Sequence, residues 1–378
     1  MKIKLFFFAI ILSANCYSQW LPEKLITSHA LLEKDSNKLT IYAEVTGFFK
    51  NNEYFSPIIK GETFPGVKIH PGITYQMDDK LKIDLGMTGI YYSGDQQKDG
   101  TYAFNGIFAR LQYAINPNFH LVFGNYYDGA NHRLIEPIYK WERQLTGKPE
   151  SGLQLIYEDN KYFADVWLNW QRFIERGDSV PEILTFGVSS SIGVSPPGNR
   201  LQISIPFQLL IYHQGGQIDV SDEKMIVSGN LATGICSKLS LNNRIIKSIG
   251  LNAYLLGYFD KISNRKIRPY NKGWGIYPVL LADASPFKCM VGYWRANKYY
   301  SFDGEPLFAS FNTDYPGISL PQRSLLTTKV SYSAQLHPTF SIGAQIETYT
   351  DLPQKRTDYS FGLYLRFNAE FLSRHINK

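Results

Sequence analysis

Seven histidines are the side chains of this chain best suited to act as bases in hydrolysis. A histidine close to a serine can activate the serine hydroxyl as a nucleophile. The second residue after each histidine is, in chain order, Leu31, Gly72, Val122, Leu134, Gly215, Thr339 or Asn377, and none is serine. The nearest approach to such a pair is His337 with Thr339, which lie in a predicted turn.

Charged side chains recur on the polar side of segments whose other side is apolar. We expect this set, with two histidines on the same side, to line the inside of a closed sheet. Its members are Glu44, Lys68, His70, Lys82, Asp84, Arg110, His120, Asp165, Lys329, Glu347, Asp358 and Arg366. The two signs could form the wall of an open pore, or they could pair and plug a narrow one, and we favour the pore. For the two histidines we favour a hydrated place in the pore wall over a metal or catalytic role.

Cysteine and charge usage exclude several classes of function. After removal of an N-terminal leader, Cys236 and Cys289 remain, and we place them on strands with opposite facing, so no disulfide is expected. No cluster of cysteine and histidine suggests zinc, and we expect no metal and no cofactor. The leader carries two lysines and no acidic residue, so its removal lowers the net charge from +6 to +4. No basic block suggests nucleic acid.

The elements that carry these residues alternate between apolar and polar side chains. In residues 200–212, Leu201, Ile203, Ile205, Phe207, Leu209 and Ile211 share one side, and Gln202, Ser204, Gln208 and Tyr212 share the other. The last such segment, residues 358–371, alternates in the same way. A period of two predicts strands with one face in lipid and one in water. Arg295 is an exception, because it falls on the apolar side near the end of a strand, from which it could reach the interface.

Short turns and longer loops alternate along the chain, which predicts an antiparallel up-and-down barrel. Seven polar turns rich in Asn, Asp, Gly and Pro separate pairs of strands. The longest loops, 127–150 and 298–323, could fold inward and constrict the lumen, or they could only seal the barrel from outside. We predict an all-β transmembrane barrel of about sixteen strands, with fourteen to eighteen as the range. Pro71, Pro206 and Pro278 fall inside predicted strands, where we expect bulges or kinks.

The two ends of the chain predict export. Residues 1–18 have two early lysines, a short apolar core and a small, polar exit, which is typical of a signal peptide. We expect residues 19–37 to be a short periplasmic segment, 38–371 the barrel and 372–378 a periplasmic tail. Both ends of the barrel would then lie in the periplasm, and the short turns with them.

The final strand carries a motif that resembles the insertion signal of Gram-negative outer-membrane barrels. In residues 360–367 the signal corresponds to Ser360, Gly362, Leu365 and Phe367. The chain is similar, by this pattern, to porin-type outer-membrane barrels of the Bacteroidetes style, although it continues past the strand to Lys378. The resemblance implies the outer-membrane location, contact with outer-membrane lipids and recognition by the outer-membrane assembly machinery.

Some outer-membrane barrels are enzymes, and their residue patterns are not found here. Outer-membrane phospholipase and lipid A deacylase use a histidine with a serine at the second following position, and no such pair exists in this chain. Omptin-like proteases need acidic pairs and an Asp-His pair near the outer rim. The single Asp-Asp pair, Asp78-Asp79, lies at the opposite end, and no Asp-His dipeptide occurs. We therefore predict that the chain is not an enzyme.

The main functional prediction is a porin-like channel through which small hydrophilic solutes diffuse. The alternative is a narrower, plugged barrel that binds a partner protein, a polysaccharide or a lipid. The two predictions differ in whether the inward charges face water or pair with one another.

Overall fold

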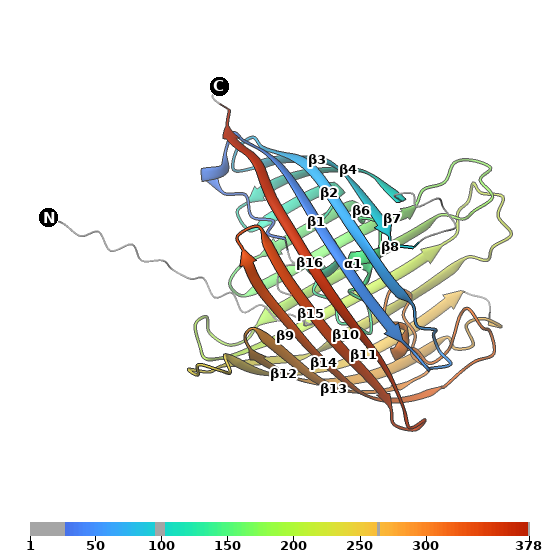
Figure 1. Cartoon of the computed structure of the whole chain (residues 1–378). Coiled ribbons are helices and arrows are strands. Elements are labelled where there is room, and N and C mark those ends of the chain that lie inside the picture. The colour runs from blue at the N-terminus through green and yellow to red at the C-terminus, as the bar shows by residue number, and fades with distance from the viewer. Residues whose placement is uncertain (1–26, 95–102, 263–264, 377–378) are drawn as a thin grey trace.

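Sixteen antiparallel strands close into one barrel in the computed structural model, which describes residues 27–94, 103–262 and 265–376 (Figure 1). The predicted fold class and strand number are confirmed. The predicted signal peptide lies outside the described residues. The strands are β1 (Lys38–Glu53), β2 (Thr63–Gln76), β3 (Leu81–Tyr92), β4 (Ala103–Asn116), β5 (Phe119–Asn125), β6 (Ser151–Glu158), β7 (Tyr162–Arg172), β8 (Ile183–Gly193), β9 (Leu201–Gln214), β10 (Ile226–Ser240), β11 (Ser248–Ile262), β12 (Lys272–Ala284), β13 (Phe287–Asn297), β14 (Gln322–His337), β15 (Phe340–Asp351) and β16 (Arg356–His375).

Helical structure is confined to short pieces in the connecting segments. They are η2 (Glu33–Asp35), η3 (Gly129–His132), α1 (Arg143–Thr146) and η4 (Pro306–Phe308). Within the described residues, no helix has the length and apolar character needed to cross a membrane.

Side-chain alternation explains why the chain forms this sheet. In β9, Leu201, Ile205 and Phe207 point outward and are 47%, 45% and 41% exposed. Ser204 and Gln208, on the inward side of the same strand, are buried. A closed wall leaves no unpaired sheet edge, and an apolar exterior suits a lipid surrounding. The chain is therefore an outer-membrane β-barrel.

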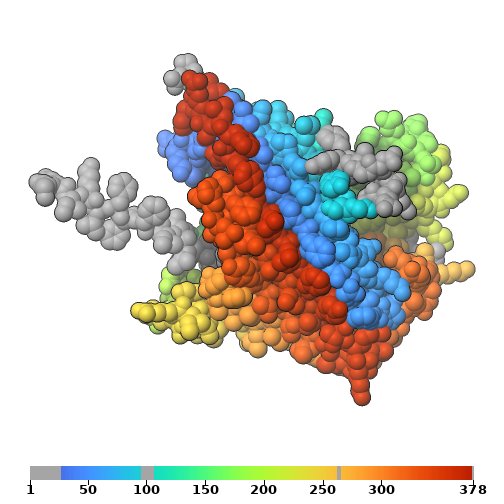
Figure 2. Space-filling view, viewed as in Figure 1, coloured from blue at the N-terminus to red at the C-terminus, as the bar shows by residue number. Residues whose placement is uncertain are grey.

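The first and last strands complete the wall. Residues Lys38 to Glu53 of β1 pair with residues His375 to Tyr359 of β16, with one bulge between Ile41 and Tyr42. Figure 2 shows this seam on the outer surface, where blue β1 runs beside red β16. The pairing reaches His375, so β16 includes residues 372–375, which were predicted to lie in a periplasmic tail.

The two ends of the barrel differ in the length of their connections. Seven short turns, such as 117–118 and 338–339, lie at the end where β1 begins and β16 finishes; we call it the turn end. The longer connections, such as 126–150 and 298–321, start from the opposite end, which we call the loop end. This alternation agrees with the predicted antiparallel connectivity.

The three prolines within strands coincide with gaps in the pairing. The β2–β3 ladder skips His70 and Pro71, and the β12–β13 ladder skips Tyr277 and Pro278. The β9–β10 ladder breaks in the same way at Pro206. Proline has no N–H to donate. Each of the three prolines therefore lies at a position where the ladder to one neighbouring strand is interrupted, and no N–H donor is needed there.

Candidate functional site

Two long loops fold into the barrel and fill the lumen on the side of the loop end. We call residues 126–150 and 298–321 the plug. The two loops bind each other, since the backbone N–H of Lys140 donates to the carbonyl of Asp303 at 2.7 Å. They also bind the wall, since Gln208 of β9 exchanges hydrogen bonds with the backbone of Arg133 and Ile135, at 2.9 and 3.0 Å.

The centre of the plug is apolar and fully packed. Ile135, Ile138, Leu307 and Phe308 have no exposed surface. These side chains form a hydrophobic core with aromatic residues of the wall, including Trp294. In the described part of the chain, this level of the lumen is therefore packed solid, and of the two arrangements left open for the long loops the inward one is found.

A buried ion-pair network joins the plug to the wall. The Lys329 ammonium of β14 lies 2.7 Å from Glu347 of β15 and 3.1 Å from Glu136 of the plug. Lys50 of β1 lies 2.9 Å from the same Glu347. Tyr349 donates a hydrogen bond to Glu136 at 2.9 Å. The charges are paired in a low-dielectric interior, so loss of one partner would leave an uncompensated buried charge.

A second buried cluster surrounds His132 of the plug. Its two ring nitrogens lie 2.7 Å from Asp165 of β7 and 3.1 Å from Glu150. Its ring stacks on Trp167, with centroids 3.7 Å apart. Burial alone would lower the pKa of His132, but the two carboxylates outweigh burial and raise the pKa to about 10. The raised pKa favours the charged form of His132, in which both ring nitrogens donate to the carboxylates.

A glycine makes room for this stack. Trp167 lies opposite Gly187 in the β7–β8 ladder. A Cβ atom on residue 187 would lie 2.0 Å from the Trp167 ring. A side chain at position 187 would therefore displace the indole that supports His132.

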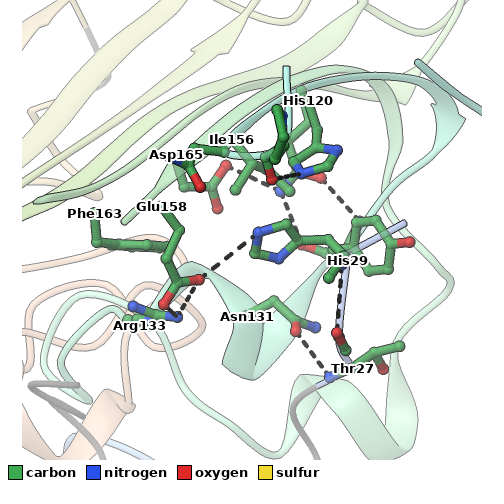
Figure 3. Close-up of a pocket in the computed structure, with 15 residues that line it drawn as sticks. Thr27, His29, His120, Asn131, Arg133, Ile156, Glu158, Phe163 and Asp165 are labelled. Atoms are coloured by element: carbon green, nitrogen blue, oxygen red, sulfur yellow. Dashed lines mark hydrogen bonds and ion pairs between the residues drawn. The ribbon is translucent and has the colours of Figure 1, made fainter. Parts of the chain in front are cut away.

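A pocket of about 290 Å³ lies between the plug, the wall and the N-terminal segment (Figure 3). His29 enters it from that segment, and its Nε2 lies 3.7 Å from a carboxylate oxygen of Glu158 at the end of β6. Arg133 of the plug donates to both oxygens of Glu158, at 2.8 and 2.9 Å. The pocket thus joins a histidine, a carboxylate and a guanidinium from three separate parts of the chain.

The N-terminal segment is held in the pocket by its backbone. Thr27 N–H donates to the side chain of Asn131 at 3.0 Å, and Gln112 of β4 donates to the carbonyl of His29 at 2.6 Å. Burial lowers the pKa of His29 to about 4, and the nearby Glu158 offsets this only in part. The His29 ring is therefore neutral at neutral pH.

A larger cavity of about 930 Å³ occupies the lumen toward the turn end and adjoins this pocket through Thr27, Ser28, Tyr127 and Asn131. Its wall carries both signs of charge. Asp84 lies 3.6 Å from Arg110 and 3.7 Å from Lys82.

Two more cations complete the lining of this cavity. Lys68 donates to the carbonyls of Gln144 and Gly147 in the plug, at 2.8 and 3.4 Å. Arg366 has two guanidinium nitrogens, Nε and Nη2, that are buried without a hydrogen-bond partner among the described residues. The charged lining is balanced, because the four cations Lys68, Lys82, Arg110 and Arg366 face the four acids Glu44, Asp84, Asp128 and Glu370. The two Arg366 nitrogens are the donors left for an anion.

The predicted inward residues all reach the lumen but fall into separate groups. Lys329, Glu347 and Asp165 belong to the buried plug contacts, and His120 lines the smaller pocket. Asp358 accepts hydrogen bonds from the backbone of Phe55 and Ser56. The larger cavity takes the others, namely Glu44, Lys68, His70, Lys82, Asp84, Arg110 and Arg366. A role for them in passing solutes is a prediction that the geometry does not test.

The residues of the terminal motif lie on both faces of β16. Leu365 and Phe367 face outward and are 48% and 37% exposed. Ser360 faces inward and bonds to Lys50 and Glu347, at 2.7 and 3.0 Å. A Cβ atom at Gly362 would lie 2.0 Å from the Tyr364 hydroxyl. Their recognition as an insertion signal stays a prediction.

Several residues of these sites were not foreseen. His29, His132, Glu136, Glu150 and Glu158 lie outside the alternating strands or at their ends, so no strand pattern marks them. One available signal was the apolar triplet Leu134, Ile135 and Ile138 inside a long loop, which is unusual for a loop in water. Within the described residues, no group of three or more His, Cys, Asp or Glu side chains is arranged to hold a metal ion.

The fold and its interior define a sixteen-stranded outer-membrane barrel with a plugged lumen. A family model described as lipid A 3'-O-deacylase-type matches residues 31–376, and the chain belongs to this family. No curated protein sequence matches the chain.

Solved structures similar to this one include proteins of three bacteria. OmpF of Salmonella typhi, in complex with daunomycin, is 13% identical, with a TM-score of 0.48 and coverage of 89% of this chain and 99% of the other. OprD of Pseudomonas aeruginosa is 10% identical, with a TM-score of 0.48 and coverage of 93% and 97%. A loop-deleted OmpT of Vibrio cholerae is 9% identical, with a TM-score of 0.47 and coverage of 88% and 100%. At these identities and TM-scores the similarity carries no conclusion about function.

Two predictions are corrected by the family match. The chain was predicted to be a porin-like diffusion channel and not an enzyme, yet its family is named for a deacylase, a lipid hydrolase. The absence of a serine at the second position after any histidine therefore does not exclude an enzyme, since the family model matches along residues 31–376. The alternative prediction, a plugged barrel that binds a lipid, agrees better with the family and with the filled lumen.

Proposed function

We propose that this protein is an outer-membrane hydrolase that removes an acyl chain from lipid A or a closely related phosphorylated glycolipid. The observation that carries this proposal is the match of the lipid A 3'-O-deacylase-type model along residues 31–376. The packed plug supports it, because a lumen filled by Ile135, Ile138 and Phe308 suits a binding site better than a diffusion path.

His29 and Glu158 are the pair that we assign to the chemistry. The neutral His29 ring takes a proton from a water molecule, and the water oxygen attacks the carbonyl carbon of the ester. The bond between that carbon and the sugar oxygen then breaks, and the proton passes to the sugar oxygen. Glu158, 3.7 Å from the ring, stabilises the imidazolium that forms in between.

The cations of the adjoining cavity suit the headgroup of such a substrate. Lipid A is a phosphorylated sugar, and guanidinium groups bind phosphate oxygens through paired hydrogen bonds. Arg110 and Arg366 line the cavity next to the pocket, and Arg366 holds donors without a partner. We assign the headgroup to this cavity and the ester to the pocket beside it.

We further propose that the turn end faces the periplasm, with both chain ends, after export by the predicted signal peptide and insertion by the outer-membrane assembly machinery. Short turns face the periplasm in bacterial barrels. A tag in the loop 215–225 should then be labelled on intact cells, and a tag in the turn 242–247 only after the outer membrane is opened. The reverse labelling would overturn this orientation.

The proposed activity is tested by incubating the purified, folded protein with lipid A in detergent and measuring the lipid by mass spectrometry. The expected product has lost one acyl chain, and the freed fatty acid appears with it. If the protein binds lipid A but the lipid stays intact, the protein is a lipid-binding protein and the proposed hydrolase activity is rejected.

A further inference from the structure

Arg295 lies on the lipid-facing side of the barrel wall, near the loop end of β13. Its neighbours on the same side of the strand, Val291 and Tyr293, are 45% and 37% exposed, and Arg295 is exposed as well. A cation among lipid-facing side chains costs free energy unless it reaches water or an anion. Within the described residues, no acidic side chain lies within 4 Å of Arg295, so the protein itself supplies no anion.

The hydroxyl groups of Tyr293 and Ser324 are neighbours of the Arg295 guanidinium. Ser324 of β14 is directly opposite Arg295 in the ladder. The Tyr293 hydroxyl lies 2.9 Å from the Ser324 hydroxyl and also interacts with Arg295. Arg295, Tyr293 and the buried Ser324 therefore form one polar group on a face of the wall that is otherwise apolar.

The surroundings of this group match the boundary between lipid chains and headgroups. Trp274, two residue pairs nearer the loop end on β12, is 45% exposed, and tryptophan favours that boundary. Ile276 lies opposite Arg295 on β12 and is 40% exposed, and Leu326 and Val291, on the side toward the middle of the wall, are 39% and 45% exposed. A lipid lying against the wall here would meet apolar side chains with its acyl chains and the polar group with its head.

We propose that Arg295, Tyr293 and Ser324 form a binding site for the phosphate group of a membrane lipid in the leaflet at the loop end. The guanidinium binds two phosphate oxygens, the Tyr293 hydroxyl bonds the same headgroup, and the buried Ser324 hydroxyl orients that of Tyr293. The acyl chains lie along Ile276, Leu326 and Val291. This site is on the outer face of the wall, and the His29 pocket is in the lumen, so the inference does not depend on the proposed hydrolysis.

The site is tested with purified barrel in detergent by native mass spectrometry, with a short-chain phosphatidate as the probe. The matching diacylglycerol, which lacks the phosphate, and inorganic phosphate, which lacks the chains, serve as comparison ligands. We expect phosphatidate to bind, diacylglycerol to bind at least roughly tenfold more weakly, and inorganic phosphate to leave the phosphatidate signal unchanged.

Variants locate the binding on the wall. Arg295→Gln should weaken phosphatidate binding by roughly tenfold, and Arg295→Lys should restore part of it, because lysine keeps the charge but loses the paired geometry. Tyr293→Phe should weaken it less. Lys60→Gln, at an exposed loop cation that no part of the argument uses, should change nothing.

Phosphatidate binding that is equal in Arg295→Gln, Lys60→Gln and the native protein would overturn the site. Equal affinity for phosphatidate and diacylglycerol would also overturn it, since the phosphate would then add nothing. Heat-modifiable migration in gels confirms that each variant is a folded barrel, and the Tyr293→Phe result decides the matter if Arg295→Gln does not fold. If the native protein binds phosphatidate as expected but does not hydrolyse lipid A, the proposed function is rejected and the lipid site on the wall stands.

Discussion

His29 is the histidine whose ring is placed to accept a proton. Its pKa of about 4 keeps it neutral, and Glu158 is 3.7 Å away. General base catalysis is worth roughly 100- to 10,000-fold in rate. We therefore expect His29→Gln to lower kcat at least about 100-fold with little change in KM, and activity to fall as the pH drops through about 4.

The control for this variant is His337→Gln, which changes an exposed histidine in a turn. Initial rates of fatty acid release are the measurement. If folded His29→Gln keeps full activity, His29 has no part in the reaction. The activity proposed from the family match would then belong to another site.

His132 links the plug to pH in a defined direction. Its pKa is raised from an ordinary value near 6.5 to about 10, so its contribution to stability is full below about 6.5 and is lost as the pH rises through about 10. For Glu150, burial would raise the pKa, but the bonds from His132 lower it to about 2, so its contribution is lost as the pH falls from about 4.5 toward 2. The contribution of the His132–Glu150 pair to stability should therefore be largest between about pH 4.5 and 6.5.

Thermal unfolding followed by tryptophan fluorescence between pH 5 and pH 10 measures this effect. His132→Gln should lower the free energy of unfolding by about 3–5 kcal/mol at pH 6, because it leaves two carboxylates unpaired. It should also remove most of the alkaline loss of stability. If His132→Gln loses as much stability between pH 5 and pH 10 as the native protein does, His132 is not the group responsible for that loss.

Residue types alone reveal little of this chemistry. The inward position of Asp165, Lys329 and Glu347 follows from strand alternation and is predicted from the sequence. Their partners His132 and Glu136 come from a loop, and contacts between a loop and a wall obey no period. The His29 pocket combines residues from three distant segments for the same reason, so it became visible only in the fold.

At the scale of the strand, β16 closes the wall and carries the predicted insertion motif. Leu365 faces lipid and pairs with Ile342 of β15, inside the membrane-spanning part of the ladder. Leu365→Asp would put a charge into lipid at a cost of up to roughly 2–4 kcal/mol, and it would damage the motif. We expect folded barrel to be nearly absent from the outer membrane, as measured by heat-modifiable migration.

Ser360→Ala is the matched change on the inward face of the same strand. It removes hydrogen bonds to Lys50 and Glu347 and should cost about 1 kcal/mol without stopping assembly. Normal amounts of folded Leu365→Asp would contradict the assigned role of the motif.

At the scale of the loop, Lys329 tests whether paired charges hold the plug in place. Lys329→Met leaves Glu136 and Glu347 without their shared cation and should destabilise the plug by about 3–5 kcal/mol. We expect the variant to show leak currents in a planar bilayer, where the native protein conducts little. Lys82→Met, which changes a cavity cation 3.7 Å from Asp84, should stay as silent as the native protein. Equal currents in all three proteins would show that this network does not close the lumen.

The strands and the loops were predictable to different degrees. Alternation over segments such as 200–212 predicts strands because one face must meet lipid and the other must not. Whether the long loops lie inside or outside depends on packing such as that of Ile138 and Phe308, which form contacts far apart in sequence. The sequence therefore predicts that these loops exist but leaves their position open.

For the whole molecule, composition and periodicity predict the barrel correctly, but the function that was predicted from them was wrong. A barrel of sixteen strands is wide enough to enclose water, and this led to the prediction of a porin. Two inserted loops change the interior without changing the wall. Fold class alone therefore does not decide between a channel and a hydrolase, and the site must decide it.

The most direct measurement of the central claim is the fate of oxygen during reaction with lipid A in water enriched in oxygen-18. Hydrolysis by water activated at His29 predicts a freed fatty acid that carries one heavy oxygen, while the deacylated glycolipid carries none. The native protein should give this product, and His29→Gln should give almost none. No freed fatty acid from folded native protein, or a fatty acid without the heavy oxygen, would contradict the account.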